Sequence, residues 1–146
     1  MTIYFYSAHE STYGCFSNFS AHGVKLNGIY WKTTEHYFQA MKFIHSPQNM
    51  EAVRRASTPR DAANIGRDRK RPLRKDWESV KDDIMRQAVL CKFETHDDLR
   101  AILLATGDEE IVENAPNDYY WGSGSDGSGR NMLGKILMET RAILQE

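Results

Sequence analysis

The sequence lacks the marks of several large classes of protein. Cysteine is scarce: Cys15 and Cys91 stand alone, without a CxxC spacing, which argues against a zinc site and against a disulfide framework. No stretch approaches the roughly 20 apolar residues that a membrane helix needs. The opening MTIYFYSAHE has neither the basic start nor the apolar run of a secretory signal. We therefore expect a soluble protein in the reducing cytoplasm, with no membrane partner.

An excess of positive charge is also missing. Lysine and arginine together number 19 against 20 acidic residues, so any contact with nucleic acid has to come from a local patch. The segment that contains Glu35 and His36 has no second histidine four residues on; His45 is nine residues away, which argues against a zinc helix. The GxxxxGK[ST] spacing of a P-loop is absent as well. We expect neither a metal nor a cofactor.

What the sequence does contain is enough apolar residues for one core. A chain of 146 residues, 40% of them hydrophobic, is in the size range of one globular domain, which we expect over residues 1–146. Short strand patterns occupy 3–6, 24–26 and 29–31. Asn27-Gly28 between the last two strands indicates a two-residue hairpin turn.

Helical periodicity begins at Thr34. It recurs in the segments 34–45, 50–56, 59–66, 77–93, 97–106 and 133–144. The expected N-caps include Thr33 or Thr34, Thr58 and Asp76. Residues 108–121 show no clear pattern, and the apolar-free stretch 122–129 is expected to be a loop. We predict a mainly α, compact single-domain helical bundle with a small N-terminal β element.

Polar and aromatic side chains are mixed in the stretch WKTTEHYFQ, residues 31–39. Glu35 falls in the first turn of the expected helix, where a carboxylate complements the helix dipole without any ligand. Alternatively, Glu35 is a catalytic carboxylate that faces a substrate, with His36 and Gln39 beside it. The residue types alone leave both interpretations open.

A second segment, residues 66–77, concentrates positive charge. Its sequence GRDRKRPLRKDW has six basic side chains and two acidic ones. It is either a solvated connection between helices or an anion site that starts at Gly66, in which Arg67 and Arg74 hold phosphate oxygens. Trp77 follows at once and either packs in the core or stacks on a base.

A third segment, residues 117–131, reads NDYYWGSGSDGSGRN. Its glycines would let the backbone approach a ligand and offer N–H groups to phosphate or ribose oxygens, next to the N-terminus of the last helix. Asp118 and Asp126 flank the glycine run and are candidates for binding a sugar hydroxyl or a water. A plain surface loop is the alternative.

Taken in order, several motifs resemble those of the NADAR superfamily, and in particular its YbiA-like members. They are Phe16-Ser17-Asn18-Phe19, Trp31-x-Thr33-x-Glu35-His36-Tyr37-Phe38-Gln39-Ala40-x-Lys42-Phe43, Gly66-Arg67, Pro72-Leu73-Arg74-x-x-Trp77, Lys92-Phe93, Asn117-Asp118-x-x-Trp121-Gly122 and Asn131-x-Leu133-Gly134. The resemblance covers residues 3–146. It implies a mainly α fold and an N-glycosidase that cleaves the bond between ribose C1 and a nitrogen.

The resemblance also implies substrates and site residues. The substrates are ADP-ribose attached to guanine in nucleic acid, best accessible in single-stranded DNA, and phosphorylated ribosylamino intermediates of riboflavin biosynthesis. Glu35, Trp77 and Asp118 correspond to active-site positions. The expected ligand-binding residues are Asn18, Phe19, His36, Gln39, Lys42, Gly66, Arg67, Arg74, Trp121, Gly122, Asp126 and Asn131.

Two chemical routes fit these residues. In direct hydrolysis, Glu35 stabilises the positive charge that develops on the ribose and orients the attacking water. In the second route, a lysine amine traps C1 as a Schiff base, with Lys25 or Lys42 as the candidate. A non-catalytic ADP-ribose or nucleotide reader remains the alternative function. A DNA ADP-ribosyltransferase is a candidate counterpart of the enzyme, and the oligomeric state is left open.

Overall fold

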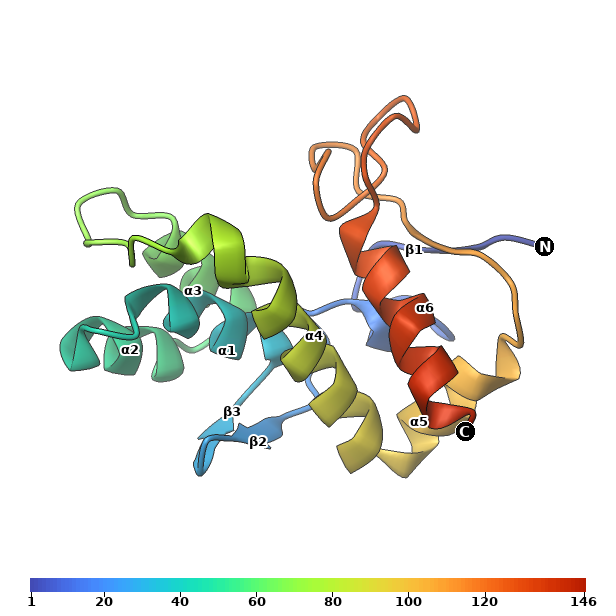
Figure 1. The fold of residues 1–146 in the computed structure, drawn as a ribbon, viewed down its shortest axis with the longest axis horizontal. Helices are drawn as coiled ribbons and strands as arrows, with labels where there is room; N and C mark the ends of the chain where they lie inside the picture. Colours follow the sequence, from blue (N-terminus) through green and yellow to red (C-terminus); the bar gives the residue numbers. More distant parts are fainter. The chain divides into compact units, whose positions relative to one another are not determined.

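Helices predominate in the computed structural model, which describes residues 1–146 (Figure 1). The α-helices are α1 (Thr34–Ala40), α2 (Pro47–Arg54), α3 (Pro59–Gly66), α4 (Trp77–Thr95), α5 (Asp97–Ala105) and α6 (Met132–Leu144). The strands are β1 (Ile3–Phe5), β2 (Val24–Leu26), β3 (Ile29–Trp31) and β4 (Ile111–Glu113), and two 3-10 turns are η1 (Gly14–Phe16) and η2 (Met41–Phe43). The predicted mainly α class is confirmed. None of the helices combines the length and the apolar character needed to cross a membrane.

The chain folds into two compact units. One is built from Met1–Ser20 together with Phe93–Glu146, and the other from Ala21–Lys92. The boundary falls within α4, near its C-terminal end. The expectation of a single domain over residues 1–146 stays a prediction, and the two units are described separately below.

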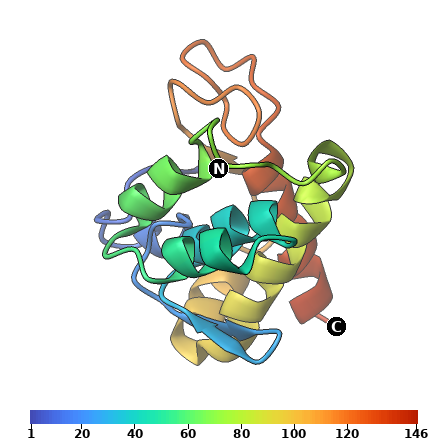
Figure 2. The same ribbon diagram turned by 90° about the vertical axis from the view of Figure 1, so that its left-hand side faces the viewer.

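The unit of residues 21–92 combines the hairpin with short helices. Asn27 (φ 56°) and Gly28 (φ 76°) adopt the positive φ angles of the predicted two-residue turn between β2 and β3. Figure 2 shows α1, α2 and α3 as neighbouring short helices, in agreement with their mutual contacts. The core of this unit includes Trp31, Tyr37 and Val53, each at most 1% exposed.

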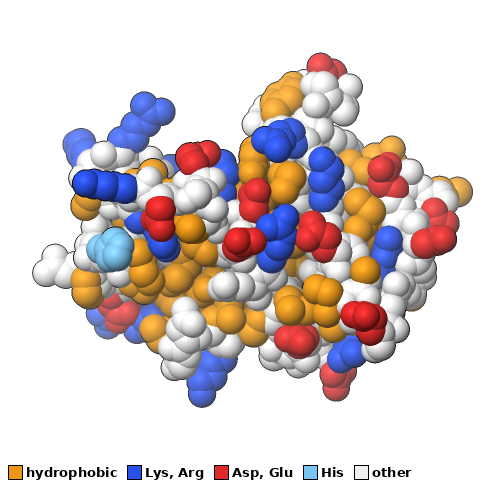
Figure 3. All heavy atoms as spheres, in the orientation of Figure 1, with side chains coloured by type: hydrophobic (Ala, Val, Ile, Leu, Met, Phe, Trp, Pro, Cys, Tyr) orange, Lys and Arg blue, Asp and Glu red, His pale blue; other side chains and the backbone are white.

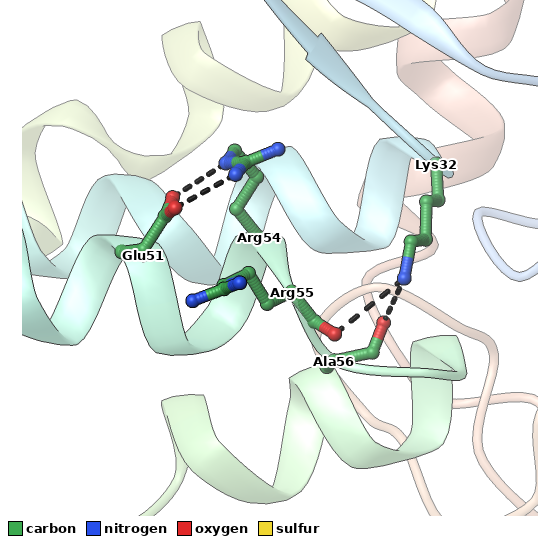
Figure 4. Close-up of polar contacts among 5 residues, drawn as sticks. All are labelled: Lys32, Glu51, Arg54, Arg55 and Ala56. Atoms are coloured by element: carbon green, nitrogen blue, oxygen red, sulfur yellow. Dashed lines mark hydrogen bonds and ion pairs between the residues drawn. The ribbon is translucent and has the colours of Figure 1, made fainter.

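A network of polar contacts fixes the start of α1 against the end of α2. Thr33 accepts a hydrogen bond from the His36 backbone N–H, as an N-cap should, and its hydroxyl lies 2.8 Å from His36 Nδ1. The other ring nitrogen, Nε2, lies 3.0 Å from the Ala56 carbonyl. Lys32 donates to the same carbonyl and to that of Arg55 (Figure 4). The entry of α1 is therefore held at several points.

The unit of residues 1–20 and 93–146 contains the sheet that the sequence did not reveal. β1 pairs in parallel with β4, with Ile3 opposite Ile111 and Phe5 opposite Glu113. β4 lies in the segment 108–121, which has no recognisable pattern, so the predicted N-terminal β element is only part of the strand content. Phe5, Phe16 and Phe93 pack edge to face, with ring centroids 5.8 and 5.9 Å apart.

Two helix predictions need correction. The helix expected over 34–45 ends at Ala40, continues as η2 to Phe43, and leaves His45 exposed outside it. Asp76 precedes α4 as expected, but its carboxylate contacts Arg74 instead of capping the helix. By contrast, α3 has its predicted bounds, and Thr58 caps it through the Asp61 N–H at 3.0 Å.

Candidate active site

Glu35 is the centre of the candidate site in the unit of residues 21–92. It is only 7% exposed, although it belongs to the first turn of a short helix. A glutamate that only complements a helix dipole needs no such burial, and ionisable side chains are seldom buried without a partner. The Gln39 side chain, one turn further along α1, donates from Nε2 to Glu35 Oε2 at 2.7 Å. A hydrogen bond to an ionised acceptor of this length fixes the carboxylate.

Gln39 is itself in an unusual position. Its Nε2 must face Glu35, because a carboxylate is an acceptor only, and this orients Oε1 the other way. Oε1 is buried and has no hydrogen-bond partner. It points at Gly66, where a Cβ would lie 2.0 Å from it. Gly66 thus makes room for the amide that holds Glu35.

Lys42 lies beyond Gln39 and brings an amine to the same cluster. Its Nζ donates to the Gly66 carbonyl at 3.3 Å and lies 5.7 Å from the centroid of the Trp77 ring. Burial lowers the pKa of the Lys42 ammonium; the Glu35 carboxylate opposes this, and Arg67 adds to it. The pair therefore consists of a buried acid and a partly buried amine with weakened proton affinity.

Trp77 borders this cluster, and its side chain is buried and packed against a neighbouring ring. It is 6% exposed and packs against Phe38, with ring centroids 5.0 Å apart at 61°. The core interpretation and the site interpretation of Trp77 therefore both have support, because its ring packs at an angle against Phe38 while Lys42 lies over it. In this unit, the structure brings together Glu35, Gln39, Lys42, Gly66 and Trp77.

Several other predicted residues of this unit have partners that leave less for a ligand. Both ring nitrogens of His36 are used by Thr33 and Ala56, and burial lowers the pKa of this imidazole, with the Ala56 hydrogen bond opposing and the Lys32 charge reinforcing the effect. Arg74 is bound to Asp76 at two points. Arg67 and Lys25 are exposed. Between the two lysine candidates, the burial and the lowered pKa favour Lys42 over Lys25.

In the other unit, Asp118 organises the turn before the glycine-rich segment. One of its carboxylate oxygens accepts from the backbone N–H groups of Tyr120 (3.0 Å) and Trp121 (2.8 Å). The other oxygen remains available to a ligand donor. Asp126 is exposed at the tip, where it accepts from Ser128, and these hydrogen bonds lower the pKa of its carboxyl group.

The glycine-rich segment is not the open phosphate cradle that its composition suggests. The N–H groups of Ser123, Gly124 and Gly129 already donate to carbonyls at 2.7–3.1 Å. The Asn131 N–H donates to the Gly122 carbonyl at 2.9 Å, and the Asn131 side chain bonds β4 from both ends, to the Glu113 N–H and the Ile111 carbonyl. These groups hold the fold of the segment, and few N–H groups are left for an anion.

The structure gives the burial of the remaining predicted residues but does not assign them to a binding site. Asn18 is buried, Phe19 is half-buried, and both follow η1 in the unit that contains Asp118. Trp121 is half-buried and Gly122 is buried in the same unit. Their assignments as ligand-binding residues stay predictions. No group of three or more His, Cys, Asp or Glu side chains is arranged to hold a metal ion.

The complete burial of Lys92 could not be predicted from the charge of its side chain. This lysine is 1% exposed, among the largest fully buried side chains of the chain, and lysine is almost never so buried without a function or a partner. A signal was present: Lys92 continues the apolar stripe of Met85 and Ala88 at helical spacing on α4. Lys92 has an interaction partner within the protein, so its burial does not by itself assign it to the cluster around Glu35.

The arrangement around Glu35 supports chemistry at a carbon that becomes positively charged. A fixed carboxylate in a buried setting stabilises a cation better than an exposed one does. An amine of lowered pKa beside it is a stronger nucleophile at neutral pH than an ordinary lysine. These are properties of the residues themselves and hold without any bound ligand.

Comparison with known proteins agrees with this chemistry. Residues 4–145 match the model of the NADAR domain. An N-glycosidase of Nostoc punctiforme is 52% identical over 97% of this chain and 91% of its own length. The N-glycosidase YbiA of Escherichia coli is 53% identical over 97% of this chain and 88% of its own length.

A solved structure and a longer protein are also similar to this chain. The NMR structure of Escherichia coli YbiA has a TM-score of 0.90 and 52% identity, covering 99% of this chain and 84% of that one. The chloroplastic riboflavin biosynthesis protein PYRR of Zea mays is 42% identical over 96% of this chain and 25% of its own length. The match along nearly the whole chain confirms the predicted relationship: the chain belongs to the NADAR domain family.

Proposed function

We propose that this N-glycosidase of the NADAR family hydrolyses the bond between ribose C1 and a base nitrogen, with ADP-ribose on guanine of single-stranded nucleic acid as its substrate. The observation that carries the proposal is the buried Glu35 carboxylate, fixed by Gln39 and placed beside Lys42. Breaking a C1–N bond leaves positive charge on the ribose ring, and a fixed carboxylate stabilises that charge as it forms.

Two routes use the same residues differently. In direct hydrolysis, Glu35 orients a water that attacks C1, the bond to the base nitrogen breaks, and the base leaves with a proton. In the amine route, neutral Lys42 Nζ attacks C1 and the base leaves with a proton. The C1–O4′ bond of the ribose then opens to give the Schiff base, and water hydrolyses it to return the free amine and the sugar. The lowered pKa of Lys42 supports the amine route, whereas the fixed carboxylate supports both.

A small-molecule substrate is the second candidate. Phosphorylated ribosylamines have the same C1–N bond, and the maize relative is named a riboflavin biosynthesis protein. The net charge of −1 gives no general attraction to nucleic acid. Both candidates require Glu35, so the choice between them depends on the substrate offered and not on the catalytic residues.

The experiment that tests the proposal follows release of free ADP-ribose from a short single-stranded oligonucleotide modified on guanine, by mass spectrometry. Glu35→Gln should lose turnover by at least about a hundredfold and keep substrate affinity within a few fold, because the charge matters mainly when the cation forms. Glu51→Gln, which changes a carboxylate in a surface pair with Arg54 (Figure 4), is the matched control and should keep turnover.

The other outcomes select among the alternatives. Turnover that survives in Glu35→Gln would remove Glu35 from the mechanism. Turnover only with ribosylamine phosphates would select the small-molecule candidate, and binding of ADP-ribose without any product would select a reader. Reduction with borohydride during turnover should attach the sugar to the protein if the amine route operates, and Lys42→Arg should abolish this attachment.

A further inference from the structure

The loop between α3 and α4 carries positive charge that its neighbours do not neutralise. Arg71 contacts Asp68 and Asn49, and Arg74 contacts Asp76. The other basic residues of the loop are exposed and form no ion pair with an acidic side chain; they are Arg67, Arg69, Lys70 and Lys75. Figure 3 shows lysine and arginine side chains gathered over this loop, at the upper left. We call residues 67–75 the basic loop.

A pocket of about 390 Å³ opens beside the basic loop. It is lined by Phe43, His45, Ser46, Pro72, Leu73, Arg74, Lys75 and Asp76. Pro72 and Leu73 give it an exposed apolar wall, with Leu73 51% exposed, and the buried Phe43 also lines it. The exposure of Leu73 leaves its apolar surface open to a ligand in the pocket.

The pocket is separate from the cluster around Glu35, but hydrogen bonds connect its wall to a residue of that cluster. Glu35, Gln39, Lys42 and Trp77 do not line it. The Arg74 N–H donates to the Lys42 carbonyl at 3.0 Å, and Arg74 Nη1 donates to the Met41 carbonyl at 3.3 Å. These bonds fix one wall of the pocket to the residue that carries the amine, so a ligand in the pocket lies beside the candidate site in the same unit.

We propose that the basic loop and its pocket bind a single strand of nucleic acid. The exposed cations contact successive phosphates of the strand, and one base enters the pocket against Pro72 and Leu73. A row of unpaired cations matches a repeating negative charge better than a single phosphate, and the apolar wall matches the flat face of a base. In a nucleic acid every phosphate is accompanied by a flat base, whereas an acidic peptide has no such fixed pairing of charge and ring.

This inference deepens the proposed function, on which it rests for its biological meaning. The pocket receives a nucleotide that flanks the modified guanine, and this distinguishes a strand from a small ribosylamine as substrate. The physical claim itself concerns unmodified strands and can be tested without any turnover.

The test measures fluorescence anisotropy of an unmodified single-stranded oligonucleotide of about 12 nucleotides across a range of salt concentrations. Arg69→Ala/Lys70→Ala/Lys75→Ala should raise Kd at least about tenfold near 0.1 M salt and reduce the slope of log K against log salt by about 2, since each phosphate contact to a single strand contributes about 0.7. The control removes exposed, unpaired cations outside the loop, Arg55→Ala/Arg60→Ala/Lys135→Ala, and should change Kd by less than about threefold.

A second variant separates the pocket from the charge. Leu73→Ser should raise Kd about three- to tenfold by removing apolar contact with a base, and should leave the salt slope unchanged. Thermal melting of each variant shows whether it is folded. If the triple variant is unfolded, the affinities of the single variants Lys70→Ala and Lys75→Ala replace it in the test.

Three results would overturn the inference. They are the absence of binding by the unaltered protein, an equal loss of affinity in the control, and tight binding of a poly-glutamate peptide of the same charge without binding of the strand. The last result would assign the surface to an acidic protein. Release of ADP-ribose from ADP-ribosylated guanosine by the unaltered protein tests the hydrolysis alone, so failure of the strand site and failure of the proposed function are distinguishable.

Discussion

Replacing Gly66 by alanine should reveal whether Gln39 holds Glu35 in place. A Cβ at residue 66 would lie 2.0 Å from Gln39 Oε1 and 2.8 Å from its Cδ, well inside van der Waals contact. The amide has to move, and its Nε2 then leaves the Glu35 carboxylate. Gly66 is the last residue of α3 and has no positive φ, so alanine suits the backbone there and only the contact with Gln39 opposes it.

The expected magnitude follows from two opposing effects. Loss of a hydrogen bond to an ionised group costs about 1.5–3 kcal/mol, whereas alanine in place of glycine in a helix stabilises by about 0.5–1 kcal/mol. Gly66→Ala should therefore lower the free energy of unfolding by about 1–2 kcal/mol. In a Gln39→Ala background the obstructing amide is absent, and only the Cβ of residue 39 stays close, at 3.0 Å. This tight contact offsets the helix gain of alanine, so the same change should be nearly neutral. The coupling between the two positions is therefore about 1–2 kcal/mol.

The assay is urea denaturation of the four proteins of this cycle, together with their rates of ADP-ribose release. In Gly66→Ala, kcat should fall about ten- to a hundredfold with little change in KM, since the displaced carboxylate no longer meets the developing cation. Equal stability changes in both backgrounds would show that Gln39 does not occupy the space at Gly66. Full turnover in Gly66→Ala would show that Glu35 needs no support from Gln39.

Three further predictions address single contacts. Because burial lowers the pKa of His36, the folded state favours the neutral ring. The contribution of His36 to the free energy of unfolding is fully present above the unfolded pKa of 6.5 and decreases as the pH drops below it. The decrease is at most about 1.4 kcal/mol per pH unit. Thermal melts at decreasing pH should show this fall, and a His36→Gln variant with the same fall would contradict the assignment. Asn131→Gly permits the φ of 53° but loses both hydrogen bonds to β4, so urea unfolding should show a loss of about 1–3 kcal/mol; a neutral result would mean that these bonds contribute nothing. Thr58→Ala removes the cap of α3 and should cost about 1 kcal/mol in the same assay, whereas Ser57→Ala, at an exposed neighbour without a capping bond, should cost nothing measurable.

Local chemistry explains which parts of the fold could be predicted from the sequence. The hairpin turn at Asn27-Gly28 and the helix Pro59–Gly66 depend on residues close in sequence, through positive φ angles and a threonine cap. The pairing of β1 with β4 depends on residues more than a hundred positions apart and on strands of three residues. Such short strands carry too little pattern to be recognised before their partner is known.

The same contrast applies to the candidate site. Glu35 and Gln39 could be chosen from the sequence because they lie among aromatic residues in the stretch 31–39 and, with Lys42, in a motif that resembles a family. The sequence did not reveal that Gln39 has an unpaired oxygen that faces Gly66. It also did not reveal that the Asp76 carboxylate pairs with Arg74 instead of capping α4. These features depend on side-chain competition between separate segments, which no local pattern records.

The bonding of residues 122–131 has a consequence for the thermodynamics of recognition. Glycine and serine runs are usually flexible, so a ligand that orders them loses affinity to the entropy of that ordering. Here the backbone bonds of Ser123, Gly124 and Gly129 fix the segment in the absence of any ligand. Its conformational entropy is lost during folding, so Asp118 is presented on a preorganised turn, and binding there should show little of the unfavourable entropy that accompanies loop closure.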